Sequence, residues 1–115
     1  LKYGAKVLPP NEILRAECDI LAPCAMGGIL HDESISKLRC KAVAGGANNQ
    51  LLAEKHGEQL RKQGILYAPD FVINAGGLLN VSCELAPEGY CATSARDKIN
   101  KIYDTLLSIY EIAEK

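Results

Sequence analysis

Four short, mostly apolar runs are spaced along the first 68 residues of the chain. They cover residues 5–8, 18–22, 41–44 and 64–68, and each is bounded by proline or by a pair of glycines. Apolar runs of this length are typical of strands that are buried on both faces of a sheet. Proline cannot donate to a strand ladder, and the residue before proline disfavours a helix. We therefore predict four short strands that stop at these boundaries.

Amphipathic segments separate the later runs. Residues 34–39 form a short candidate helix with Asp32 and Glu33 near its positive end, and residues 49–63 form a longer helix that Gly64 would end. In the longer segment, large side chains recur every four residues, at Leu52, His56 and Leu60. This alternation of strands and helices predicts an α/β fold with a parallel sheet.

The last third of the chain predicts further helices. After an extended run at 71–73, a helix is expected to begin near Leu78. The longest helix is expected from Ser94, a candidate cap with Asp97 three residues later. Its apolar stripe consists of Ile99, Ile102, Tyr103, Leu106, Tyr110 and Ala113. Such a stripe needs a surface to pack on, either this sheet or a part that the chain lacks.

Composition narrows the class of protein. The chain has 115 residues and is 48% apolar, which favours one folded domain. A net charge of −1 without a basic cluster argues against nucleic-acid binding. No apolar stretch is long enough to span a membrane and no signal-peptide pattern is present, so we expect a cytoplasmic protein. The five cysteines form no Cys-x-x-Cys pair, and neither His31 nor His56 has metal-ligand spacing, so no metal site is expected.

Three junctions combine small residues with proline or amide side chains. They are Ala22-Pro23-Cys24-Ala25, Gly45-Gly46-Ala47-Asn48-Asn49 and Asn74-Ala75-Gly76-Gly77. Ligands of open parallel sheets bind beyond the carboxyl ends of the strands, so these runs are candidate ligand contacts. Structural explanations stay open for each run: Pro23 can stop a strand, Asn48 can cap a helix, and the glycines can allow a tight turn.

The Asn48-Asn49 pair offers more amides than one helix cap needs. The spare carboxamide of Asn48 or Asn49 can donate and accept together, which suits a ligand with a carboxamide or amino group. Leu78 and Val81, three residues apart on one helix face, would line an apolar wall beside such a ligand or belong to the core.

Four runs in order carry a resemblance to a known family. They cover residues 19–25, 44–51, 64–77 and 102–107. Together they resemble the amino acid dehydrogenases, the family of the glutamate, leucine, phenylalanine and valine enzymes, and the leucine dehydrogenases in particular. The resemblance implies an incomplete, doubly wound parallel sheet of Rossmann type with a long C-terminal helix. Residues 1–92 would be the C-terminal half of an NAD-binding domain, and residues 93–115 a helix returning onto it or onto an absent substrate domain.

The resemblance also implies an activity. The family oxidatively deaminates an L-amino acid to a 2-oxo acid and ammonia, reversibly, with NAD as cofactor. Its catalytic lysines and aspartate lie in an N-terminal domain that this chain does not resemble. We therefore expect no catalytic residue in this chain, an inactive fragment, and a full-length homo-oligomer that acts on a small molecule.

Cofactor contacts follow from the same resemblance. It implies that Ala22, Pro23 and Cys24 pack near the nicotinamide ribose. Asn49 would hydrogen-bond near the substrate amino group and the nicotinamide, and Asn74 would help to hold the nicotinamide end. Rigid strand ends suit this task, because hydride transfer requires cofactor and substrate at contact distance in a fixed orientation.

Leu78 and Val81 match the family positions that wall the side-chain pocket. Two aliphatic residues there favour a branched-chain amino acid as substrate. An aromatic amino acid is the alternative within the family. A non-catalytic α/β domain that binds a nucleotide or has a regulatory role is the alternative outside it.

Overall fold

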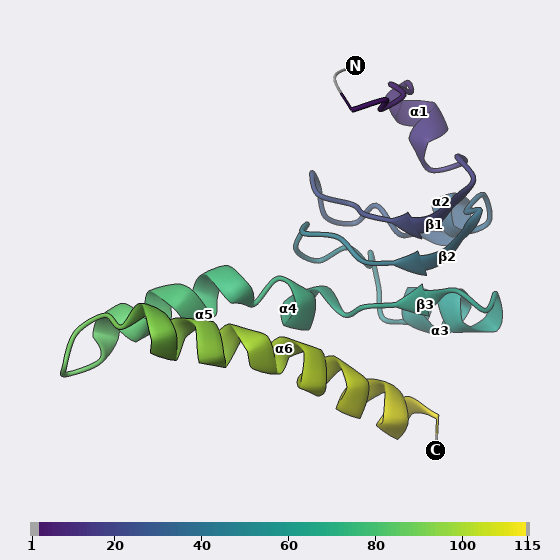
Figure 1. Cartoon of the computed structure of the whole chain (residues 1–115). Coiled ribbons are helices and arrows are strands. Elements are labelled where there is room, and N and C mark those ends of the chain that lie inside the picture. The colour runs from purple at the N-terminus through teal and green to yellow at the C-terminus, as the bar shows by residue number, and fades with distance from the viewer. Residues whose placement is uncertain (1–2, 115) are drawn as a thin grey trace.

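The computed structural model describes residues 3–114, which form a parallel three-stranded sheet with flanking helices and a long C-terminal helix (Figure 1). The strands are β1 (Cys18–Leu21), β2 (Cys40–Val43) and β3 (Leu66–Tyr67), in the order β1-β2-β3. Leu21 pairs with Val43, which in turn pairs with Tyr67. The predicted α/β class, with its parallel sheet and long terminal helix, is confirmed.

Helices connect and follow the strands. They are α1 (Pro10–Ile13), α2 (Asp32–Ile35), α3 (Lys55–Lys62), α4 (Asp70–Ile73), α5 (Gly76–Ser82), the 3-10 turn η1 (Cys83–Leu85) and α6 (Ala92–Ala113). The loops after β1 and β2, and the helices α4 and α5 after β3, extend from the same side of the sheet (Figure 1). That side is the carboxyl edge, where the sequence placed its three junctions.

The core lies between the sheet and the two helices α2 and α3. Its buried members are Leu21, Leu30, Ile35, Val43, Leu60 and Ile65. Each contributes aliphatic area, and full burial of such a side chain is worth about 1.5–3 kcal/mol. The core therefore anchors the strands, and with them the loops at the carboxyl edge.

Helix α6 runs back along α5 and α4 (Figure 1). Four residues of its predicted stripe are half-buried, namely Ile99, Ile102, Leu106 and Tyr110, whereas Tyr103 and Ala113 are exposed. Ala95 is the buried residue of this helix. Within residues 3–114, no helix has the length and apolar character needed to cross a bilayer.

Several predicted boundaries are wrong at the N-terminal side of an element. Residues 5–8 form no strand. Helix α2 begins at Asp32 rather than at Ser34. Helix α3 begins at Lys55 instead of residue 49, because Leu51 pairs with Leu30 in a parallel bridge that holds the preceding residues extended.

The C-terminal third also differs from the prediction. Residues 71–73 belong to α4 and are not extended, and α5 begins at Gly76, two residues before Leu78. Helix α6 begins at Ala92 after Cys91, so Ser94 lies within its first turn and does not cap it. The division of the chain at residues 92/93 stays a prediction, and residues 1, 2 and 115 of those two predicted domains lie outside the described residues.

Candidate functional site

The first two junctions are in direct contact. The Ala47 N–H donates to the Pro23 carbonyl at 2.9 Å, and the Gly46 N–H donates to the Cys24 Sγ at 3.3 Å. A Cβ on Gly45 would lie 2.1 Å from the Pro23 carbonyl oxygen, which is far inside van der Waals contact. Glycine is therefore required where the loop after β2 crosses the loop after β1.

The third junction reaches the second through Asn74. Its Nδ2 donates to the Ala47 carbonyl at 3.1 Å and to Asn48 Oδ1 at 3.0 Å. The Oδ1 of Asn74 is buried and has no hydrogen-bond partner within the described part of the chain. The structure thus brings together all three candidate runs, which follow β1, β2 and α4.

The expectation that Asn48 caps a helix is wrong. The next helix, α3, begins seven residues later, and its N-cap is Glu54. Asn48 instead accepts the hydrogen bond from Asn74, so its side chain ties two loops together.

Asn49 has a left-handed backbone conformation, with φ of 51°. Its carbonyl accepts from the Gly28 N–H at 2.7 Å, and a Cβ on Gly27 would lie 2.6 Å from the Asn48 carbonyl oxygen. The side chain of Asn49 is exposed, and no hydrogen bond occupies it in the range 3–114. A non-glycine residue with positive φ stores strain that surrounding contacts must hold. The result is an accessible carboxamide on a fixed backbone.

Two buried polar residues behind the loop were missed from the sequence. Asp70 Oδ2 accepts from the Gln50 N–H at 2.6 Å, and Gln50 Nε2 donates to the carbonyls of Gly45 at 2.7 Å and Ala47 at 2.9 Å. Burial raises the pKa of Tyr67 to about 12, and the charge of Asp70 adds to the shift. Asp70 opens α4, and an acid directly after proline at a helix start was the available signal.

Leu78 and Val81 lie on α5, three residues apart as predicted for one helix face. Their exposed fractions are 75% and 54%, so neither belongs to the core of the described residues. The two aliphatic side chains therefore form an open apolar surface beside the carboxyl edge.

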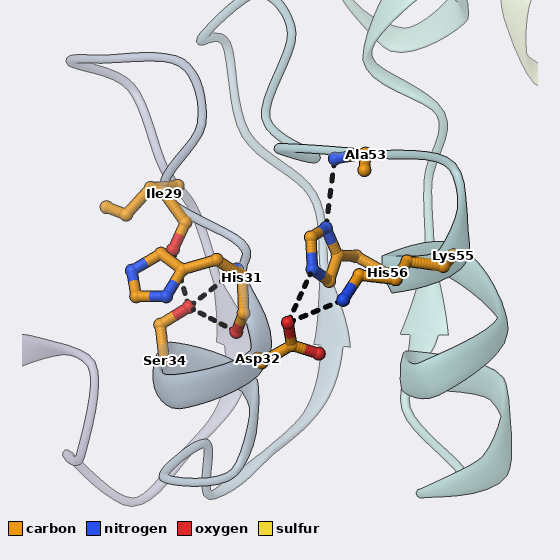
Figure 2. A network of polar contacts seen from close by, with 7 residues as sticks. All are labelled: Ile29, His31, Asp32, Ser34, Ala53, Lys55 and His56. Atoms are coloured by element: carbon orange, nitrogen blue, oxygen red, sulfur yellow. Dashed lines mark hydrogen bonds and ion pairs between the residues drawn. The ribbon is translucent and has the colours of Figure 1, made fainter.

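Both histidines have structural surroundings (Figure 2). The Ala53 N–H donates to Nδ1 of the buried His56 at 2.9 Å, so Nδ1 carries no proton in this arrangement. The other ring nitrogen, Nε2, lies 3.5 Å from Asp32 Oδ2. Lys55 Nζ donates to the same carboxylate oxygen at 2.6 Å. His31 contributes its backbone N–H to Ser34 Oγ at 2.9 Å. This network joins α2 to α3.

No group of three or more metal-ligating side chains occurs in residues 3–114. The cysteines are free thiols, and the described structure contains no disulfide. What the carboxyl edge does offer is hydrogen-bonding amides, small residues and backbone groups, a set that suits a planar ring bearing a carboxamide, and its sugar.

Comparisons with known proteins match this architecture. A family model described as Glutamate/Leucine/Phenylalanine/Valine dehydrogenase matches residues 2–111. The chain is 52% identical over 114 residues to leucine dehydrogenase from Thermoactinomyces intermedius, covering 99% of this chain and 31% of that enzyme. It is 50% identical over 108 residues to phenylalanine dehydrogenase from Bacillus thermotolerans, covering 94% of this chain and 28% of that enzyme.

A solved structure agrees with the sequence comparison. The crystal structure of L-tryptophan dehydrogenase from Nostoc punctiforme superposes with a TM-score of 0.92 at 51% identity, covering 98% of this chain and 34% of that one. The chain thus spans about a third of the length of its relatives. With its parallel sheet, its clustered junctions and a family match over nearly its whole length, the chain belongs to the glutamate/leucine/phenylalanine/valine dehydrogenase family.

Proposed function

We propose that this chain is the C-terminal part of the cofactor-binding domain of an NAD-dependent L-amino acid dehydrogenase. The complete enzyme would interconvert an L-amino acid with its 2-oxo acid and ammonia, NAD accepting the hydride when bound. The observation that carries the proposal is the meeting of the three junctions through Asn74, Asn48 and the Ala47 carbonyl. Family membership supplies the reaction class.

The residues at the carboxyl edge fit a nicotinamide. Asn49 presents an exposed carboxamide that can both donate to and accept from a ligand amide. Ala22 and Cys24 are exposed and small enough for a ribose to lie against the backbone, and Pro23 fixes their direction. Asn74 uses both its donor hydrogens on protein acceptors, so it would hold the nicotinamide end by fixing Asn48.

The substrate we propose is a branched-chain amino acid such as leucine. Leu78 and Val81 present aliphatic surface on α5, which would exclude water from one side of an apolar side chain. An aromatic amino acid is the second candidate, because relatives that act on phenylalanine and tryptophan are as similar as the leucine enzymes. We propose that the chain alone is inactive and that activity requires the remaining length of its relatives' chains.

The test is amino-acid-dependent reduction of NAD by the full-length enzyme and by its Asn49→Gly variant. Glycine tolerates the left-handed backbone conformation and removes the carboxamide together with the Cβ that carries it. Loss of one hydrogen bond to the reacting groups should lower kcat/KM about 10- to 100-fold. Asn100→Ala is the control, because Asn100 is exposed on α6, and this variant should keep the parental rate.

Leucine, phenylalanine and tryptophan should be assayed in parallel. A kcat/KM highest for leucine supports the branched-chain proposal, and a higher value for either aromatic substrate replaces it. If the full-length protein reduces NAD with none of the three, the proposed function is wrong.

A further inference from the structure

A buried polar pair stands directly behind the loop that carries Asn48 and Asn49. Asp70 is 8% exposed and Gln50 is completely buried. Asp70 Oδ2 accepts from the backbone N–H of Gln50 at 2.6 Å, although the two residues are 20 positions apart. A buried, charge-assisted hydrogen bond of this length strongly constrains the group that it holds. Asp70 therefore fixes the end of the loop to the start of α4.

The side chain of Gln50 fixes the rest of the same loop. Its Nε2 donates to the carbonyls of Gly45 and Ala47, so both donor hydrogens point back into the loop. Its Oε1 is buried without a hydrogen-bond partner in residues 3–114. A buried carbonyl oxygen without a partner is costly, so the two hydrogen bonds donated by this side chain must offset that cost. We call Asp70 and Gln50 together the loop clamp.

The loop clamp and the exposed amides act on opposite sides of one short segment. The carbonyls of Gly45 and Ala47 face the clamp, while the side chains of Asn48 and Asn49 are exposed. Asn49 keeps its left-handed φ of 51° only while the residues around it stay in place. A weakened clamp would release this strain and turn the amides away from their present direction.

We propose that Asp70 and Gln50 are positioning residues for the nicotinamide end of the cofactor. They touch no ligand, and act by holding Asn48 and Asn49 in the orientation that a ligand carboxamide needs. This inference rests on the proposed function. It predicts that disturbing the clamp weakens contacts to the nicotinamide and leaves contacts to the rest of the dinucleotide intact.

The test compares two probes with the full-length protein. ADP-ribose has every part of NAD except the nicotinamide ring, so a general loss of structure weakens both probes equally. The variant is Asp70→Asn, which keeps the shape of the side chain and removes its charge. By calorimetry, we expect the Kd for NAD to rise about tenfold and the Kd for ADP-ribose to change less than twofold.

Gln50→Met is the second variant, because it removes both donors at similar volume and tests the same loop independently of α4. Asp104→Asn, at an exposed position on α6, is the matched control and should leave both constants unchanged. Equal weakening of both probes in the folded variants, or no change for either, would overturn the positioning role. If the parental protein binds neither probe, the proposed function fails instead, before any variant is compared.

Discussion

At the scale of single residues, the carboxyl edge depends on backbone geometry at two positions, Gly45 and Asn49. Gly45 allows the loop after β2 to cross Pro23 within a distance that no side chain permits. Asn49 holds a conformation that most residues avoid. At both positions the path of the loop requires a backbone arrangement that most residues would disfavour.

Two glycine substitutions should therefore have opposite effects. Gly45→Ala would force a Cβ to within 2.1 Å of the Pro23 oxygen, so we expect a loss of about 1–3 kcal/mol in the free energy of unfolding. Gly77→Ala lies in α5 with no atom within 4 Å of the added Cβ, so we expect a gain of about 0.5–1 kcal/mol. Urea unfolding measures both, and equal effects at the two positions would contradict the steric argument.

At the scale of elements, α2 and α3 are held together by the network around Asp32 (Figure 2). The hydrogen bond from Lys55 lowers the pKa of Asp32 below its usual 3.8, with a smaller contribution from His56. A carboxyl group with a lowered pKa in the folded state stabilises the protein above its unfolded pKa. This stabilisation is lost as the pH falls through the folded value.

Asp32→Asn should reduce the loss of the free energy of unfolding as the pH falls. We expect the urea midpoint of the parental chain to fall more steeply between about pH 5 and pH 2 than that of the variant. The effect should be small, because Asp32 and Lys55 are both exposed and solvent screens the pair. Asp104→Asn serves as the control that keeps the parental slope, and two parallel curves for parent and Asp32→Asn would rule out the contribution.

The elements that could be predicted from the sequence were those with local signals. Proline and glycine end the strands at Pro23, Gly45 and Pro69, and the long stripe identifies α6. The predicted elements were wrong where contacts between residues far apart in the sequence determine the local structure. The run 71–73 has β-branched residues but follows a Pro-Asp helix start, and Leu51 leaves the predicted α3 to pair with Leu30. Local propensity does not contain such pairings.

The candidate site was predictable only in outline. Its first two runs could be placed at one edge because parallel strands end together. The third run follows residues 71–73, which are helical and not extended, so its place at this edge depends on α4. The contacts within it, such as Asn74 to Asn48 across 26 positions, depend on the closed fold. The clamp residue Gln50 lies within residues 44–51, one of the four runs that resemble the family, yet no sequence pattern distinguishes a buried glutamine from an exposed one.

At the scale of the whole molecule, burial is uneven. The sheet with α2 and α3 contains the main core, whereas α6 has a single buried residue across its 22 positions. The described helices that α6 contacts most are α4 and α5, which are themselves short. Low burial of this kind gives a low free energy of local opening.

Amide hydrogen exchange on the 115-residue chain should reveal this division. We expect the amides of β2 and α3 to exchange by global unfolding and those of α6 to exchange at least tenfold faster, because few buried contacts oppose its opening. Mass spectrometry of peptides from the two regions measures the rates. Equal protection of α6 and β2 would show that the chain unfolds as one cooperative unit.

The sheet order gives β1 a strand neighbour on one side only within residues 3–114. The backbone N–H and C=O groups on its outer side thus have no neighbouring strand, and the exposed Ile20 adds apolar surface to this strand. An unpaired edge strand of this kind can form backbone hydrogen bonds with another extended segment, including the same strand of a second copy. The charged Asp19 and Lys41, paired at 2.6 Å beside it, oppose stacking by keeping that surface hydrated. In residues 3–114 β3 lies at the opposite edge of the same sheet, so association of this chain through its sheet depends on two edge strands and on the ion pair beside β1.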